Sequence, residues 1–254
     1  MQISKYDASG NDFIIFHSFI KRDRSRLAKK LCDRKRGIGA DGMIVLVPHS
    51  EYDYEWEFYN SDGSVAEMCG NGSRAAAHYA VSNSLAPSSH SFLTLAGVIE
   101  AEVRGDFVKI KLTSPEILKE PFEEEGFLWH FYDTGVPHLV AYVDDLELFD
   151  KELCAKMRYK YNANVNFAKA DGDRLYVRTY ERGVEDETLA CGTGMAASFY
   201  GAYRDKKVKD SVRVYPKSGE ELEISFKNSS IYFGGEVRNP FNTIIRLDNE
   251  FDPS

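Results

Sequence analysis

Two cysteines stand in nearly identical surroundings about half the chain apart. Cys69 lies in the segment MCGNG (68–72), and Cys191 lies in the segment ACGTG (190–194). Each segment is followed by small residues with good helix propensity, SRAAA in the first case and MAAS in the second. A Gly-x-Gly turn followed by such residues predicts the start of a helix. Each cysteine is therefore expected at a helix N-terminus, where unpaired backbone N–H groups and the helix dipole favour the thiolate.

A pair of such thiols could form a redox disulfide, bind a metal ion, or exchange protons with a carbon atom. Metal binding fits poorly because no further ligands stand at suitable spacing, so no metal site is expected. A redox pair makes no demand on the residues around it. Proton exchange does, because inverting a stereocentre without a cofactor requires one base on each face of the substrate. The two bases should be alike, since each acts as acid in one direction and as base in the other.

Removing an α-proton also requires that the substrate carboxylate accept negative charge. Preorganised hydrogen-bond donors near that carboxylate supply this stabilisation. The backbone N–H groups of 70–72 and 192–194 could form two such donor sets at the helix ends. The sequence shows no pyridoxal lysine site and no dinucleotide fingerprint, and so no cofactor is expected.

The composition is that of an ordinary soluble protein of one large or two smaller domains. The chain has 254 residues, 43% hydrophobic and 28% charged residues, and a formal net charge of −8. The acidic balance argues against a nucleic-acid partner. No apolar stretch is long enough to cross a bilayer, and the N-terminus lacks a signal-peptide pattern, which predicts a cytoplasmic protein. Cys32 and Cys154 lie in amphipathic helical stretches and are expected to be buried, free thiols.

The segments around the two cysteines follow the same order. An alternating strand pattern over 54–59 and a turn precede Cys69, and a similar strand over 175–180 and a turn precede Cys191. Further strands are expected before these, over 43–47 and 165–168. Short strands also follow each helix, over 92–95, 98–103 and 108–112, and over 212–215, 221–226 and 231–233.

This pattern predicts an α+β protein with a duplicated fold. Each half is expected to form a mostly antiparallel, barrel-like sheet around a central helix, with the active site in a cleft between two pseudo-symmetric halves. Prolines and glutamates break the periodicity near 115–125. We therefore expect one half over 1–118 and the other over 119–235, with 236–254 as a segment that can pack back on the first half.

Several short polar motifs occur along the chain in a fixed order: Asn11-Asp12-Phe13, Asn60-Ser61-Asp62-Gly63, the first cysteine segment, Asn164-Val165-Asn166-Phe167, and Tyr180-Glu181-Arg182-Gly183 with the second cysteine segment. In identity and order they give the chain a close resemblance to the diaminopimelate epimerase family. It implies a two-base isomerase, without cofactor or metal, that converts LL-diaminopimelate into the meso form in lysine and peptidoglycan-precursor synthesis. It also implies a small amino-acid substrate as partner and a homodimer.

The same resemblance implies roles for individual residues. Cys69 and Cys191 correspond to the catalytic pair, the first as proton donor and the second as acceptor. His138 and Glu181 correspond to positions that tune the cysteine pKa values. The residues that correspond to the substrate-binding set are Asn11, Asn60, Gly70, Asn71, Asn164, Glu181, Arg182, Gly192 and Thr193. Arg182 could pair with a substrate carboxylate and Glu181 with an ammonium group.

Departures from the family pattern bear on substrate choice. Val136 stands where many members have an asparagine, and Gly42 stands where some members have a glutamine. The first alternative is therefore a related racemase or epimerase of another amino acid, of the proline, hydroxyproline or basic type. The second is a thiol redox switch, because the resemblance also implies that the two cysteines can form an inactivating disulfide.

Overall fold

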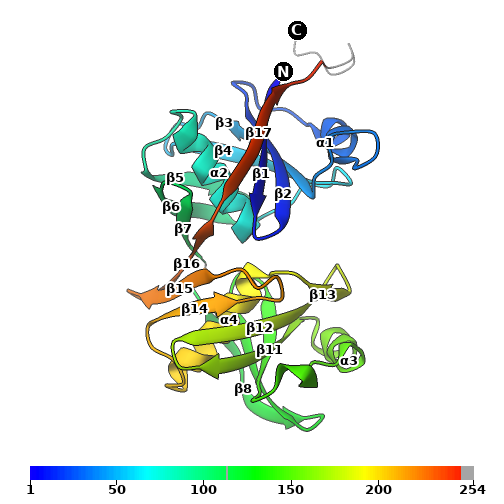
Figure 1. Cartoon of the computed structure of the whole chain (residues 1–254), viewed down its shortest axis with the longest axis vertical. Coiled ribbons are helices and arrows are strands. Elements are labelled where there is room, and N and C mark those ends of the chain that lie inside the picture. Colours follow the sequence, from blue (N-terminus) through cyan, green and yellow to red (C-terminus); the bar gives the residue numbers. More distant parts are fainter. Residues whose placement is uncertain (113, 247–254) are drawn as a thin grey trace. The chain divides into compact units, whose positions relative to one another are not determined.

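The computed structural model describes residues 1–112 and 114–246 and forms a mixed α+β fold with four α-helices in those ranges. The chain divides into two compact units. The first unit comprises residues 1–110 and the described part of the segment that starts at Glu236, and the second comprises residues 111–235. Each unit contains one helix that begins directly after a cysteine and a second helix nearer its outer side (Figure 1).

The first unit is a sheet of eight strands. In spatial order these are β17 (Arg238–Ile244), β1 (Gln2–Ala8), β2 (Asn11–His17), β3 (Gly42–Val47), β4 (Tyr54–Asn60), β5 (Ser89–Thr94), β6 (Gly97–Arg104) and β7 (Phe107–Lys111). The β2–β3 and β4–β5 pairs are parallel, and the other pairs are antiparallel.

The second unit follows the same succession of pairings. Its strands in spatial order are β8 (Glu116–Glu124), β9 (Phe127–Asp133), β10 (Pro137–Tyr142), β11 (Asn164–Asp171), β12 (Arg174–Glu181), β14 (Ser211–Tyr215), β15 (Leu222–Lys227) and β16 (Ser230–Glu236), and the short β13 (Asp186–Thr188) adds to β12. Here the parallel pairs are β10–β11 and β12–β14, at the positions that β2–β3 and β4–β5 hold in the first unit.

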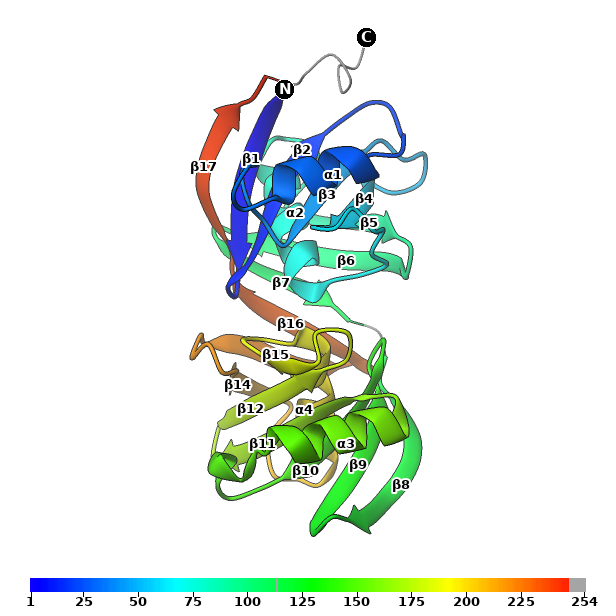
Figure 2. The ribbon, with the colours of Figure 1, turned by 90° about the vertical axis from the view of Figure 1, so that its right-hand side faces the viewer.

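One helix in each unit packs against several strands at once. Helix α2 (Gly70–Ser82) contacts β1, β2, β3 and β6, and helix α4 (Gly192–Arg204) contacts β9, β10, β11, β12 and β15 (Figure 2). Alanines and glycines make up six of the thirteen residues in each helix, and these small residues allow the backbone to approach the strands closely. Most of each helix is buried, which is why its composition shows no polar face.

The second helix of each unit covers the other side of the strands. Helix α1 (Ser25–Cys32) buries Leu27 and Leu31 against β3 and β4. Helix α3 (Lys151–Tyr161) packs on β11 and β12, begins after an Asp150 side chain that accepts a hydrogen bond from the Leu153 N–H, and ends at Asn162 in the left-handed region. A short 3-10 helix (Leu146–Leu148) precedes α3.

Residues 116–124 form strand β8 and pair with β9, although the sequence pattern indicates a break in periodicity there. Most of its side chains are exposed, and the pairing with β9 shifts register between Lys119 and Phe122. Tertiary pairing with a regular neighbour therefore creates a strand that the local pattern does not predict.

None of the helices in the described ranges combines the length and apolar character needed to span a bilayer.

Candidate functional site

Cys69 is the N-cap residue of helix α2. Its backbone is extended, and its Sγ accepts a hydrogen bond from the Gly72 N–H at 3.4 Å. The first backbone N–H groups of the helix, those of Gly70 and Asn71, point toward this end because they have no intrahelical acceptor. The half-buried thiol therefore lies beside the positive end of a helix dipole, as the sequence predicts.

The Cys69 thiol also faces the side chain of Asn11. Its Sγ lies 3.5 Å from Asn11 Oδ1, and Asn11 Nδ2 donates to Asp41 Oδ2 at 2.8 Å. Since a carboxylate can only accept, Asp41 fixes the amide so that its oxygen faces the thiol. Arg34 binds Asp41 and Asp12 at 2.7 Å each and holds this arrangement in place. Cys69 therefore has an acceptor, Asn11 Oδ1, that favours the thiol, beside the Gly72 N–H donor, which favours the thiolate.

Asp12 belongs to the same polar cluster. Burial alone would raise the pKa of this carboxyl, but hydrogen bonds from Arg34 and Lys5 hold it well below its usual range. Asp12 therefore stays ionised and keeps both cations in place. The sequence analysis singled out Asn11 but not Asp41 or Arg34, whose roles depend on contacts with Asn11 and Asp12 across 30 and 22 residues of sequence.

Arg74 is a fully buried cation in helix α2 that the sequence analysis did not identify. Its Nη2 donates to Ser9 Oγ at 2.6 Å and to Asn71 Oδ1 at 2.9 Å, and its Nη1 donates to the Glu236 carbonyl oxygen at 3.3 Å. The Asn71 side chain is thus held within the protein. Its backbone N–H at the helix end is then the group of Asn71 that a substrate carboxylate could reach.

Cys191 is the N-cap residue of helix α4 and is 8% exposed. Its Sγ lies 3.5 Å from Thr193 Oγ1, and that hydroxyl lies 2.9 Å from His138 Nε2. The Thr134 hydroxyl donates to the Thr193 carbonyl oxygen at 2.8 Å. The second unit therefore brings the predicted residues His138 and Thr193 together beside the cysteine.

The strand ends near Cys191 hold the residues predicted to bind the distal end of the substrate. Asn164 begins β11, and its Oδ1 accepts a hydrogen bond from the Arg182 N–H at 2.7 Å. Arg182 Nη1 donates to the Asn162 carbonyl oxygen at 3.0 Å. Burial raises the pKa of the neighbouring Glu181 carboxyl.

The first unit contains one further residue predicted to bind the substrate, Asn60. It ends β4, and its Nδ2 donates to Ser64 Oγ at 2.9 Å.

The other two cysteines, Cys32 and Cys154, lie in the protein interior. Cys32 and Cys154 are buried and free, and burial raises the pKa of each thiol to about 12. Both thiols are therefore protonated at neutral pH, and their burial confirms the expectation of buried, free thiols.

His138 should make the stability of the protein depend on pH. Burial lowers its pKa to about 3, with the nearby Arg182 charge as a second cause. The unfolded chain then binds a proton near pH 6.5 that the folded protein does not accept. We expect the free energy of unfolding to fall by up to about 1.4 kcal/mol per pH unit below pH 6.5 on account of this residue.

The measurement is denaturant unfolding between pH 7 and 4.5, compared with the variant His138→Gln. The variant should have a flatter dependence on pH over this range. Burial also lowers the pKa values of His90 and His130, but these two residues are present in both proteins and contribute equally. If the free energy of unfolding had the same slope against pH in both proteins, the assignment of His138 as a buried neutral imidazole would be wrong.

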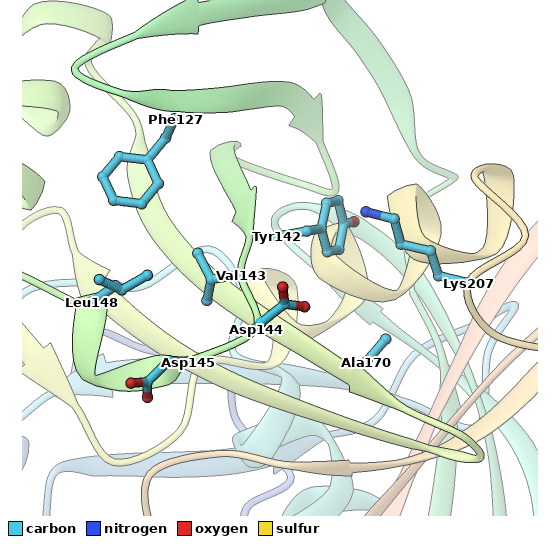
Figure 3. A pocket seen from close by; sticks show the side chains of 8 residues that line it. All are labelled: Phe127, Tyr142, Val143, Asp144, Asp145, Leu148, Ala170 and Lys207. Carbon is cyan, nitrogen blue, oxygen red and sulfur yellow. The ribbon is translucent and has the colours of Figure 1, made fainter.

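A cavity of about 580 Å³ opens elsewhere in the second unit. It is lined by Phe127, Tyr142, Val143, Asp144, Asp145, Leu148, Ala170 and Lys207 (Figure 3). None of these residues belongs to the predicted site. Within residues 1–112 and 114–246, no group of three or more His, Cys, Asp or Glu side chains could hold a metal ion.

Comparison with known proteins identifies relatives along almost the whole chain. Residues 3–118 and 130–238 match the family model described as diaminopimelate epimerase. A diaminopimelate epimerase of a Nitratiruptor species is 60% identical over 244 residues, which cover 96% of this chain and 98% of the relative.

Solved structures with much lower identity share the fold. A Bacillus anthracis phenazine biosynthesis protein of the PhzF family aligns with a TM-score of 0.73 and 14% identity, covering 97% of this chain and 99% of that one. A hydroxyproline epimerase from Agrobacterium vitis, solved with trans-4-hydroxy-L-proline, aligns with a TM-score of 0.71 and 15% identity, covering 96% and 91%. At such identities the likeness concerns the fold alone.

Proposed function

This chain belongs to the diaminopimelate epimerase family, and we propose that it converts LL-2,6-diaminopimelate into meso-diaminopimelate with Cys69 and Cys191 as its two bases. The observation that carries the proposal is that each cysteine caps a helix at the same place in an equivalent unit. In this proposal the two units are pseudo-symmetric, barrel-like halves that close on the substrate from opposite sides. The reaction serves lysine and peptidoglycan-precursor synthesis.

The chemistry removes the α-proton from one face of a stereocentre and adds a different proton to the opposite face. The Cys191 thiolate takes the α-proton from one face of the LL isomer and becomes a thiol. The electron pair left on carbon is stabilised as the α-carboxylate accepts charge, and the Cys69 thiol then donates its proton to the opposite face. Atoms and charge balance without a cofactor, and the pair ends with its single proton on Cys191. The acceptor at Cys69 (Asn11 Oδ1) supports this direction.

The helix ends and the polar strand ends have separate tasks in this mechanism. The backbone N–H groups of Gly70 and Asn71, and of Gly192 and Thr193, hold the α-carboxylate, because two helix dipoles favour an anion between them. Asn11, Asn60 and Asn164 orient the substrate. Their side chains lie at strand ends in their own units.

Arg182 and Glu181 recognise the second amino-acid end of the substrate. We expect Arg182→Met to reduce kcat/KM for LL-diaminopimelate by about 10- to 100-fold, since a hydrogen bond to a charged group contributes about 1.5–3 kcal/mol. The loss should lie in KM. The measurement is steady-state kinetics on LL-diaminopimelate and on L-lysine, which lacks the distal carboxylate. Preference of the unsubstituted protein for lysine would favour the alternative of a basic amino-acid racemase.

Deuterium uptake tests the proposed function directly. The reduced protein is incubated with LL-diaminopimelate in D₂O, and α-deuterium and the stereoisomer ratio are followed together. We expect deuterium at one α-carbon together with conversion toward the meso isomer. Absence of exchange, with both thiols shown to be reduced by titration, would overturn the proposal.

Assembly and location complete the proposal. The family resemblance supports a homodimer that acts in the cytoplasm. Sedimentation equilibrium across a range of protein concentrations tests the first point, and a monomer at all concentrations would contradict it. Fractionation of cells that express the chain tests the second.

A further inference from the structure

Three polar side chains are buried together beneath the first turn of helix α4. His138 and Asn166 are 0% exposed and Thr179 is 3% exposed. Asn166 Nδ2 donates to the Leu139 carbonyl oxygen at 2.8 Å, and Asn166 Oδ1 accepts from the Thr179 hydroxyl at 2.8 Å. Because a carbonyl oxygen can only accept, the Asn166 amide has one possible orientation here.

This orientation determines where the His138 ring carries its proton. Asn166 Nδ2 lies 3.1 Å from His138 Nδ1, so that ring nitrogen must accept a hydrogen bond and is unprotonated. The buried ring is neutral, as its lowered pKa indicates. Its single proton is then on Nε2, which donates to Thr193 Oγ1 at 2.9 Å. Asn164 Nδ2 also lies 3.4 Å from Nε2, and it donates to the Pro137 carbonyl oxygen at 3.4 Å. With Nδ1 unprotonated, Nε2 carries the ring proton, and the Pro137 carbonyl is then the acceptor for Asn164 Nδ2.

The chain of contacts ends at the sulfur of Cys191. Since Thr193 Oγ1 accepts the proton of His138 Nε2, the proton of the hydroxyl itself is directed to its other neighbour, Cys191 Sγ, at 3.5 Å. A donor favours the thiolate. The contrast with Cys69 is clear, because Asn11 presents an acceptor to that sulfur. Besides the Gly72 N–H that Cys69 also accepts, the side-chain neighbours of the two cysteines therefore differ in sense: an acceptor at Cys69 and a donor at Cys191.

The first unit shows that the fold does not require these polar residues. Phe13 pairs with Gly42 as His138 pairs with Asn164, and Ile44 pairs with Phe58 as Asn166 pairs with Thr179. The strand positions of His138, Asn166 and Thr179 thus correspond to those of three apolar residues, Phe13, Ile44 and Phe58.

The helix glycines confirm this correspondence. A Cβ atom added to Gly72 of α2 would lie 3.2 Å from Ile44 and 3.5 Å from Phe13. A Cβ atom added to Gly194 of α4 would lie 2.4 Å from Asn166 Oδ1 and 3.0 Å from Thr179 Oγ1. The same space beneath the helix is therefore filled by hydrocarbon in one unit and by a polar network in the other. Burying a polar group costs free energy unless the group forms its hydrogen bonds. The side chains of this network form theirs in the single arrangement described above.

We propose that Asn166 and Thr179 are positioning residues for Cys191: they hold His138 as the Nε2–H tautomer, so that the Thr193 hydroxyl donates to the cysteine sulfur. The proposal rests on the proposed function for its kinetic consequences but not for its structural claim. His138 then acts on Cys191 through a hydrogen bond and not as a cation.

The structural claim is tested on the unsubstituted protein by ¹⁵N NMR of its histidine rings. Long-range ¹H–¹⁵N correlations at pH 7 distinguish protonated from unprotonated ring nitrogens, and His138→Gln identifies the signal. We expect an unprotonated Nδ1 and a protonated Nε2. A protonated Nδ1 would overturn the proposal whether or not the protein epimerises diaminopimelate, and so a failure of the proposed function is distinguished from a failure of this inference.

The kinetic consequence is tested with three variants. Asn166→Leu, of similar shape, should lower kcat by about 10- to 100-fold, the equivalent of one hydrogen bond to a charged group, with KM changed less than about threefold. Thr179→Val should lower kcat in the same direction, and Thr179→Ser, which keeps the hydroxyl, should restore it. Equal kcat values for Thr179→Val and Thr179→Ser would contradict the positioning role. If Asn166→Leu does not fold, the Thr179 pair and the NMR measurement still decide the question.

Discussion

Replacing either Cys69 or Cys191 with alanine is expected to lower the rate of epimerisation by at least about 10²- to 10⁴-fold, the range that one general acid or base contributes. Each thiol is needed in every turnover, because one must remove a proton and the other must return one. The measurement is the initial rate of conversion of LL-diaminopimelate, with circular dichroism to show that the variant is folded. A variant that retains more than a tenth of the activity would contradict the two-base mechanism.

The buried thiols provide the matched controls. Cys154→Ala and Cys32→Ala should leave the activity per folded molecule unchanged, since both side chains pack in cores beside helices α3 and α1. These substitutions should lower the stability instead, by about 1–2 kcal/mol for a small cavity. Loss of activity from Cys154→Ala in a folded protein would argue against the assignment of Cys69 and Cys191 as the reactive pair.

Replacing Glu57 with leucine is expected to destabilise the protein by about 3–5 kcal/mol. Glu57 forms an ion pair with Arg24, and the two side chains are only 7% and 3% exposed. Removing the carboxylate leaves a buried guanidinium whose other partners, the Ser18 hydroxyl and two carbonyl oxygens, carry no opposite charge. Denaturant unfolding at pH 7 measures the effect.

The double variant Arg24→Met/Glu57→Leu is the control for this prediction. It removes both charges and keeps similar volumes, so it should recover much of the lost stability, as buried ion pairs often can be replaced by apolar residues at little cost. If the double variant were as unstable as Glu57→Leu, the loss would reflect packing or the lost hydrogen bond from the Arg22 N–H to Glu57 Oε1, and not an uncompensated charge. A double-mutant cycle that includes Arg24→Met measures the interaction energy between the two side chains separately from the effect of each substitution alone.

Local sequence was sufficient for the secondary structure near the two cysteines. The Gly-x-Gly turns and the alanine-rich runs predict helices after Cys69 and Cys191, and the structure has α2 and α4 begin one residue after each. The alternation over 54–59 and 175–180 matches β4 and β12. These features depend on residue propensity and a period of two, which are visible in a short window. Strand β8 was missed because its exposed residues have no such alternation.

The roles of several polar residues could not be predicted in this way. Arg74 follows Ser73 in a run of small residues, and nothing in that run indicates that its guanidinium is fully buried and donates to Ser9 Oγ. Asn166 was visible as part of a motif, and with a period of two it shares a strand face with Asn164. Its orientation, however, depends on the Leu139 carbonyl and on Thr179, which belong to neighbouring strands.

The sequence by itself determined that two like cysteines begin two like helices, since propensity and the duplicated order of segments act locally. Only the tertiary structure decided the sense of the side-chain hydrogen bond at each sulfur, which at Cys69 adds to the backbone bond from Gly72. That sense is set by Asp41 through Asn11 at Cys69, and by Asn166 through His138 and Thr193 at Cys191. The physical reason is that a donor or acceptor is fixed by its partners, and strand pairing brings those partners from distant parts of the chain.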